Sequence, residues 1–227
     1  NTVMKEKLRR TCIIFVLFIV TWSILTFPLI THPFSSMLAP DEPINEDTIF
    51  KIWFPWYVST YFTRMLINPS LFRYVDIYYH PWGTDLYLSS PCFYHAGLPA
   101  VVTRLKGYPA DGNFHFLVTM TGNAYAAYLA LRILGVNAVP ATLGGAALLL
   151  NPYSIDTFIE GRDEQSNAWF VLLGIALMHL LIRRGGRKRT VQAGVVILLA
   201  GLFYWFHALF LLLFLIILTL YQSLSEP

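Results

Sequence analysis

The amino-acid sequence predicts an all-α polytopic membrane protein, with about five to six transmembrane helices and a long extracytoplasmic first loop that carries interfacial helices. Composition gives the first reason. Hydrophobic residues make up 56% of the 227 residues and charged residues 13%, whereas soluble domains carry about 25% charge. The second reason is clustering, because the apolar runs between the charged clusters approach the roughly 20 residues that a bilayer-crossing helix needs.

The first transmembrane helix is expected at about residues 11–30, directly after the basic residues Lys5, Lys7, Arg9 and Arg10. Basic residues mark the cytoplasmic end of a span, so the N-terminus is predicted to lie in the cytoplasm. A cleaved signal peptide is the alternative interpretation. The length of the apolar run and the lack of a small-residue cleavage site after it favour an uncleaved anchor.

Residues 32–112 are the least apolar part of the chain and are predicted to form the extracytoplasmic loop. A loop of this length in a compact protein is usually functional. Within it, the segment from Ile49 to Ile67 is rich in Trp and Tyr and carries basic residues, which is typical of a helix in the membrane interface. A tight turn is expected at residues 78–85, and a second short helix at residues 90–105.

The rest of the chain is predicted to return to the membrane. Further spans are expected at about residues 114–134, 138–153, 168–182, 191–204 and 206–221. Counting spans from a cytoplasmic N-terminus puts the basic block of residues 183–189 in the cytoplasm, as the positive-inside rule requires. Residues 191–221 are longer than one perpendicular helix needs, so two short helices that break near Tyr204 are favoured over one long tilted helix.

Several other functions are not supported by the sequence. The net charge of +3 is small and the basic residues flank apolar runs, so nucleic-acid binding is excluded. No disulfide is predicted, because Cys12 lies in the first apolar helix and Cys92 in a distant loop. No metal site is predicted, because His80, Asp85 and His95 are irregularly spaced. His115 and His179 lie in apolar spans, where packed imidazoles are the default.

Because the chain starts at Asn1 and stops after an apolar run, we expect the N-terminal part of a longer protein.

Candidate catalytic residues lie in the first loop, shortly after the first span. Asp41, Glu42 and Asp47 come where the loop is still close to the membrane surface. A partly desolvated carboxylate there could take a proton from an acceptor hydroxyl, or bind a divalent metal ion that handles a diphosphate. The alternative is that these acids keep an exposed loop solvated.

Short motifs spread over nearly the whole chain resemble the integral-membrane glycosyltransferases of the GT-C fold, which include protein O-mannosyltransferases and aminoarabinose transferases. The matching segments are Asp41-Glu42, Asp47 with residues 49–56, the turn at residues 79–86, residues 123–132 with Gly135, Asn151-Pro152-Tyr153, and residues 161–165. The resemblance implies a polyprenyl-phosphate-linked sugar donor, an active site at the extracytoplasmic face, and an inverting hexosyl or pentosyl transfer. Its base would be a first-loop carboxylate, with Asp41 the first choice, Asp47 the second, and Glu42 beside them.

The same resemblance suggests residues for binding the donor. Arg162 could hold the phosphate, because a planar guanidinium binds phosphate oxygens bidentately, and Glu164 lies in the same loop. The alternative for Arg162 is a local ion pair with Glu160, Asp163 or Glu164. Tyr204 and His207 could contact the donor headgroup, or could belong to an aromatic belt at the membrane interface.

These inferences place the protein in the cytoplasmic membrane of a bacterium or archaeon, where it would serve the cell envelope. The expected partners are the lipid-linked sugar donor and membrane lipids, with a divalent metal ion left open as a cofactor. A non-catalytic subunit or scaffold, bound to further membrane subunits, is the alternative from another class. A transporter ranks last, because the spans carry few charges away from their ends and no inverted repeat is apparent.

Overall fold

The computed structural model describes residues 2–38, 46–76, 81–85 and 93–225. The described chain is mostly helical and contains a two-stranded antiparallel sheet. The helices are α1 (Thr2–Leu25), α2 (Glu46–Ile67), α3 (Phe93–Lys106), α4 (Ala110–Ile133), α5 (Ala138–Leu149), α6 (Pro152–Ile159), α7 (Asp163–Ser166), α8 (Trp169–Arg184), α9 (Arg187–Phe203) and α10 (Trp205–Ser225), with 3-10 turns at Leu29–Thr31 and Pro69–Phe72. Strands β1 (Tyr74–Val75) and β2 (Thr84–Asp85) pair Tyr74 with Asp85.

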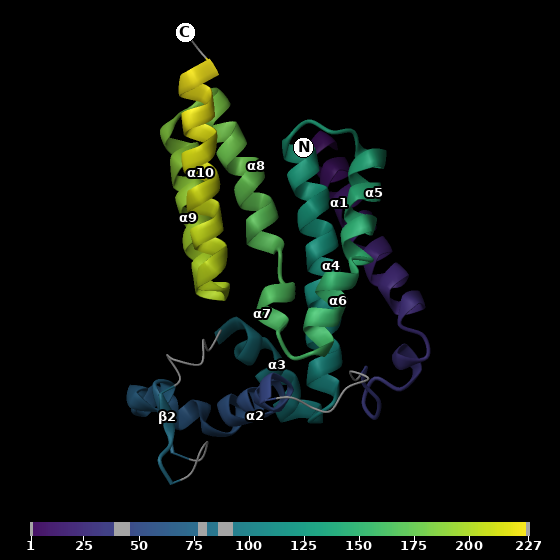
Figure 1. Cartoon of the computed structure of the whole chain (residues 1–227). Helices are drawn as coiled ribbons and strands as arrows, with labels where there is room; N and C mark the ends of the chain where they lie inside the picture. Colours follow the sequence, from purple (N-terminus) through teal and green to yellow (C-terminus); the bar gives the residue numbers. More distant parts are fainter. Residues whose placement is uncertain (1, 39–45, 77–80, 86–92, 226–227) are drawn as a thin grey trace.

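The helices form two upright groups above a crosswise layer (Figure 1). Helices α1, α4 and α5 make one group, and α8, α9 and α10 make the other, with α4 packed against α8 between them. Helices α2 and α3 lie across the lower end of α4. The short helices α6 and α7 occupy the junction between the upright groups and this crosswise layer, which we call the platform.

The first upright group is held together by a buried apolar core. Phe18 and Trp22 of α1 pack against Phe116 and Met120 of α4, and Phe158 of α6 stacks on Phe116 with ring centroids 4.4 Å apart. The side chains in this core are large. The contact between α4 and α8, in contrast, depends on a small residue. A Cβ atom at Gly122 would lie 2.2 Å from the ring of Trp169. Small residues at such positions let helices approach closely.

The second upright group has its own core of Met178, Ala193, Ala200 and Leu211, contributed by α8, α9 and α10. Two helices, α9 and α10, occupy the long apolar stretch at the C-terminal end, and they meet at Tyr204. The backbone of Tyr204 is extended (φ −161°, ψ 114°), which interrupts the helix, and α10 runs back beside α9 (Figure 1). The structure therefore has the break that the length of this stretch predicted.

The platform is built from aromatic residues. Helix α2 buries Phe54, Tyr57 and Met65 against β1 and α3, and the rings of Trp53 and Tyr57 stack 5.0 Å apart. The observed bounds, Glu46–Ile67 and Phe93–Lys106, lie within three residues of the two helices expected in the first loop. Both lie crosswise to the upright helices, as an interfacial helix would (Figure 1).

Two segments of the described chain are long and apolar enough to cross a membrane, Asp163–Arg184 and Trp205–Leu224. The sequence predicted five to six spans, so that prediction was wrong in the number of spans. The reason lies in length and polarity. Helix α5 has 12 residues, or roughly 18 Å at 1.5 Å per residue, while α1 begins with charged residues and α4 includes buried Asp111, His115 and Asn123.

The segment between the spans predicted at residues 138–153 and 168–182 is partly helical, because it contains α6 and α7. The side chain of Asn151 accepts a hydrogen bond from the Tyr153 amide at 3.1 Å and caps α6, while Pro152 occupies the first helical position. Asparagine caps and proline at this position are common helix-start signals. Helix α7 then forms one further turn before α8.

Candidate functional site

The platform meets the upright helices through a backbone contact between α2 and the turn that joins α6 to α7. The hydroxyl of Thr48 donates a hydrogen bond to the carbonyl of Glu160 at 3.1 Å. Gly161 is in the left-handed region (φ +91°), and a Cβ atom there would lie 2.5 Å from the amide nitrogen of Thr48. Only glycine permits this approach, so the first turn of α2 is fixed against this turn.

This contact brings together two residues that the sequence analysis selected. Asp47 precedes Thr48, and Arg162 follows Gly161, so the two residues belong to adjoining backbone segments although they are far apart in sequence. Asp47 is exposed in the first turn of α2. Arg162 forms an ion pair with Glu160, which is the local pairing considered as its alternative role. Both residues are partly exposed, at about 40% of each side chain, so this pair is weak.

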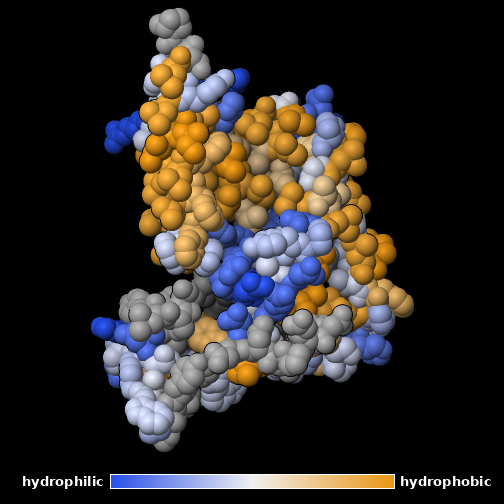
Figure 2. Space-filling model, viewed as in Figure 1, coloured by the Kyte–Doolittle hydropathy of each residue, from blue (hydrophilic) through white to orange (hydrophobic). Residues whose placement is uncertain are grey.

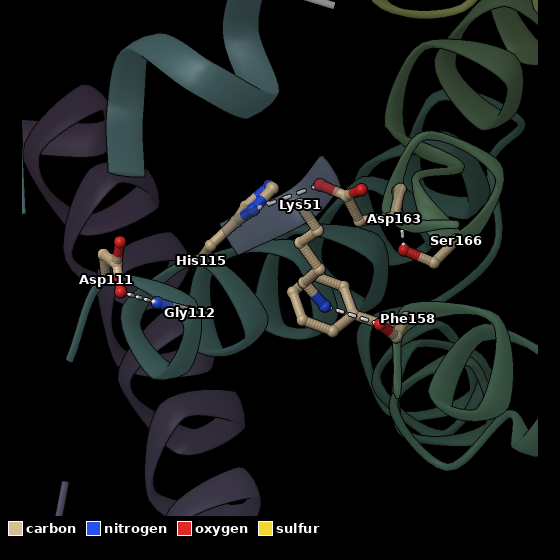
Figure 3. Close-up of polar contacts among 7 residues, drawn as sticks. All are labelled: Lys51, Asp111, Gly112, His115, Phe158, Asp163 and Ser166. Carbon is tan, nitrogen blue, oxygen red and sulfur yellow. Dashed lines mark hydrogen bonds and ion pairs between the residues drawn. The ribbon is translucent and has the colours of Figure 1, made fainter. Parts of the chain in front are cut away.

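Lys51 lies one turn further along α2 and reaches into the same junction (Figure 3). Its ammonium nitrogen donates to the carbonyl oxygen of Phe158 at 2.5 Å and lies 3.4 Å from the centroid of the Phe158 ring. Burial lowers the pKa of Lys51 from 10.5 to about 8, and the carboxylates of Asp163, Glu164 and Asp111 oppose that effect. A buried ammonium is costly unless it is paired.

A buried histidine, which lines the same small cavity as Lys51, pairs with a buried acid. The Nδ1 atom of His115, on α4, lies 3.3 Å from a carboxylate oxygen of Asp163, and both side chains are almost fully buried. Asp111 lies one turn before His115 and accepts hydrogen bonds from the Thr103 hydroxyl at 2.5 Å and from the Gly112 amide at 2.8 Å. Charged and polar side chains thus gather from α2, α4 and α7 (Figure 3), and the Thr103 hydroxyl adds α3 to them.

Asn123 holds the turn between α7 and α8 against the middle of α4. Its amide nitrogen donates to the carbonyl of Ser166 at 2.7 Å, and its carbonyl oxygen accepts from the amide of Ala168 at 2.8 Å. The indole of Trp169 donates to the carbonyl of Thr119 at 3.1 Å. These contacts position α7, and with it Asp163 and Glu164.

The other two predicted donor-binding residues lie at the break between α9 and α10. Burial raises the pKa of Tyr204, and the nearby carboxylate of Glu164 raises it further. Glu164 therefore acts electrostatically on both Lys51 and Tyr204. The ring of His207 packs edge-on against Tyr204 with centroids 5.1 Å apart, so the structure connects Glu164, Tyr204 and His207.

Asp41 and Glu42 lie outside the described residues. Among the residues that the structure does describe, no three side chains of His, Cys, Asp or Glu gather as metal ligands would. Asp85, one of the irregularly spaced candidates considered for metal binding, forms an ion pair with Arg73 at 3.0 Å.

Two cavities border the site. A small cavity of about 30 Å³, lined in part by Thr48, Lys51, Asp111 and His115, has room for water but not for a sugar. A groove of about 760 Å³ lies between α2 and α3, and Trp53, Trp56, Arg104, Tyr108 and Asp111 contribute to its walls. Its volume falls within the range of about 300–1,000 Å³ that is usual for small-molecule sites.

Hydrophilic residues are also visible on the surface at the level of α6 and α7. Figure 2 shows them as a band between the apolar upright helices and the platform. Exposed side chains on the upright helices are strongly apolar and include Val16, Ile24, Leu143, Leu198 and Ile217. Charged and polar residues thus gather where the apolar surface ends.

Sequence reasoning missed the buried members of this site. Lys51 and Asp111 were not selected, Asp163 was considered only as a possible ion-pair partner of Arg162, and His115 was assigned to ordinary packing. A spacing signal was present, because Asp111 and His115 are four residues apart, as are Asp47 and Lys51, so each pair shares a helix face. The contact of Lys51 with Phe158 spans 107 residues of sequence and has no local signature.

Comparison with known proteins adds no assignment. No protein-family model, curated protein or solved structure matches this chain. The interpretation of the site therefore depends on its geometry and on the motif resemblance described above.

Proposed function

We propose that the protein is a membrane glycosyltransferase that moves a sugar from a polyprenyl-phosphate donor to an acceptor at the extracytoplasmic face. The observation that carries the proposal is the contact of Thr48 with Glu160 and Gly161. This contact supports a site in which an exposed carboxylate, Asp47, and a guanidinium, Arg162, lie close enough to contact the same donor and acceptor. A base and a phosphate-binding cation are the two groups that such a transfer requires.

In the proposed reaction, Asp47 accepts the proton of the acceptor hydroxyl as its oxygen attacks the anomeric carbon of the donor. The bond between that carbon and the phosphate oxygen breaks, and its electron pair leaves with the polyprenyl phosphate. Arg162 stabilises the departing phosphate by bidentate hydrogen bonds. Attack from the face opposite the leaving group inverts the configuration. Asp41, for which the resemblance alone argues, is the alternative base.

The donor phosphate would lie in the hydrophilic band, and its polyprenyl chain would lie in the bilayer. We propose that the apolar upright helices are embedded in the membrane, with α8 and α10 crossing it, α9 returning between them, and the start of α1 on the cytoplasmic side. The basic residues support this orientation. Arg183, Arg184 and residues 187–189 lie at the end opposite the platform (Figure 1), and basic residues prefer the cytoplasmic side.

Cysteine labelling tests the orientation. In a variant in which Cys12 and Cys92 are replaced by serine, we expect a cysteine at Ser70 to react with a membrane-impermeant maleimide in intact cells. A cysteine at Thr190 should react only after the membrane is permeabilised. Labelling of the second position in intact cells would reverse the topology and move the site to the cytoplasm.

Transfer from polyprenyl-phosphate sugars tests the chemistry. The purified protein in lipid should transfer radiolabelled sugar from at least one member of a panel of donors, and Arg162→Gln should raise the KM for the donor. A matched change, Arg73→Gln, removes a guanidinium from the platform ion pair with Asp85 and should leave the KM for the donor unchanged. Equal effects of both substitutions would remove Arg162 from the proposed site.

A specific observation also favours the second candidate function, a non-catalytic subunit. The buried groups Lys51, His115 and Asp163 have partners within the chain, and the cavity beside them holds water at most. Such a cluster could serve only to hold the platform in place for a partner. In that case, the protein should copurify with other membrane subunits, and substitution of Asp47 should leave the assembled complex active.

A further inference from the structure

A second cavity lies at the other end of the upright helices, far from the junction with the platform. It has a volume of about 420 Å³ and is formed by α1, α4 and the start of α5. Its walls contain Glu6, Arg10, Thr11, Ile13, Ile14, Tyr128, Leu129, Arg132 and Ala138. We propose that this cavity binds the headgroup of an anionic phospholipid of the cytoplasmic leaflet. The inference goes beyond the proposed transfer reaction and depends only on the proposed membrane orientation.

Charge supports a phosphate ligand. Two guanidinium groups, those of Arg10 and Arg132, and one carboxylate, that of Glu6, line the cavity, so its net charge is positive. One Nη atom of Arg132 donates to the carbonyl of Val136 at 2.7 Å, and this hydrogen bond holds the side chain at the cavity. A guanidinium has five N–H donors, so most of them do not take part in this bond. Guanidinium groups bind phosphate oxygens through paired hydrogen bonds.

The ion pair between Arg10 and Glu6 does not block this role. Its atoms are 2.5 Å apart, but the two side chains are 73% and 61% exposed. Exposed pairs of residues four apart on a helix are weak because water screens them and because both side chains lose freedom. A phosphate group can therefore compete with the Glu6 carboxylate for Arg10.

The apolar surface beside the cavity supports a lipid over a free anion. Ile13 and Ile14 line the cavity, and Val16, Leu17, Val20 and Ile24 continue along α1 as exposed apolar side chains. From Ile13 to Ile24 this surface runs for roughly 16 Å at 1.5 Å per residue. That length is about half of the ~30 Å hydrocarbon core, or one leaflet. A charged cavity that continues into an apolar surface one leaflet long matches a phospholipid headgroup with its acyl chains.

The position in the proposed topology agrees with this ligand. The helix ends that form the cavity lie at the same end of the molecule as the basic turn between α8 and α9 (Figure 1). Anionic lipids of the cytoplasmic leaflet attract basic residues near the membrane surface. The site therefore faces the leaflet that contains its proposed ligand.

Thermal unfolding of the full chain in detergent tests the inference, with dioctanoyl phosphatidylglycerol, dioctanoyl phosphatidylcholine and inorganic phosphate as probes. We expect phosphatidylglycerol to raise the unfolding temperature of the wild type, while phosphatidylcholine and phosphate at the same concentrations do not. In Arg132→Gln, the concentration needed for half of that rise should increase roughly tenfold or more, because a charged hydrogen-bonded contact is lost. Arg10→Gln should act in the same direction without disturbing the bond from Arg132 to Val136.

Arg183→Gln is the matched control, because it removes one positive charge from the same end of the molecule but outside the cavity. It should bind phosphatidylglycerol like the wild type. Equal stabilisation by phosphatidylcholine, equal stabilisation by inorganic phosphate, or an equal loss in Arg183→Gln would overturn the proposal. None of these measurements uses glycosyl transfer, so failure here and failure of the proposed function are distinguishable.

Discussion

The ammonium group of Lys51 donates to the carbonyl oxygen of Phe158 at 2.5 Å and lies 3.4 Å from the centre of the same residue's ring. One side chain of the platform is thus inserted between the polar backbone and the aromatic face of α6. The contact joins segments that are 107 residues apart. It also places a titratable group at the boundary between the platform and the upright helices. The protonation of this group should therefore affect the free energy of unfolding.

The stability of the protein should depend on pH through Lys51. The pKa of Lys51 is lowered to about 8 in the folded protein and returns toward 10.5 on unfolding. Between these values the unfolded chain binds more protons, so stability rises with pH, and the gain is lost as pH falls toward 8. We therefore expect the difference in free energy of unfolding between wild type and Lys51→Met to change in favour of the wild type from pH 8 to 10. A difference that is constant from pH 7 to 10 would show that Lys51 is not buried.

Gly161→Ala should separate the platform from α6 and α7. The left-handed backbone alone costs a non-glycine residue about 1–2 kcal/mol, and the collision of the new Cβ with the backbone of Thr48 should add ~1–3 kcal/mol. Gly135→Ala is the matched control, because Gly135 has the same φ of +91° but nothing within 4 Å of its Cβ position. Detergent-induced unfolding measures both. Similar losses in the two variants would mean that the approach of Gly161 to Thr48 does not hold the platform.

Asn123→Ala should loosen α7 and lower stability. The substitution leaves the carbonyl of Ser166 and the amide of Ala168 without their side-chain partner inside the protein, and each unpaired buried group costs about 1–3 kcal/mol. We expect a loss of ~2–4 kcal/mol in the free energy of unfolding. Asn137→Ala is the control, since Asn137 is exposed and its side chain makes no capping bond. Its effect should stay within about 0.5 kcal/mol.

The parts of the fold that follow local rules could be predicted from the sequence. The aromatic segment near Trp53 predicted a helix in the first loop, and the excess length of residues 191–221 predicted the break at Tyr204. The number of membrane-crossing helices could not be predicted in this way, because apolar composition does not reveal that α5 ends at Leu149 after 12 residues. Polar residues such as Asn123 also appear in apolar stretches for reasons that only packing explains.

The candidate site was predicted in its exposed residues and missed in its buried ones. Asp47 and Arg162 stand out in sequence because charged residues are scarce in this chain. Lys51, in contrast, resembled one of the basic residues that anchor an interfacial helix. Its role depends on the carbonyl of Phe158 and the carboxylate of Asp163, which approach only after α6 and α7 pack against α2.

The most direct test of the proposed function is sugar transfer by the purified protein in lipid, measured for wild type, Asp47→Asn and Asp156→Asn with a panel of polyprenyl-phosphate sugars. Asp156 is an exposed acid on α6 and serves as the matched control. The proposal predicts transfer by the wild type and by Asp156→Asn, and a loss of about 10²-fold or more in kcat for Asp47→Asn, as expected when a general base is removed. Full activity of a correctly folded Asp47→Asn protein would contradict the assignment of the base, and the absence of transfer from every donor would favour the non-catalytic subunit.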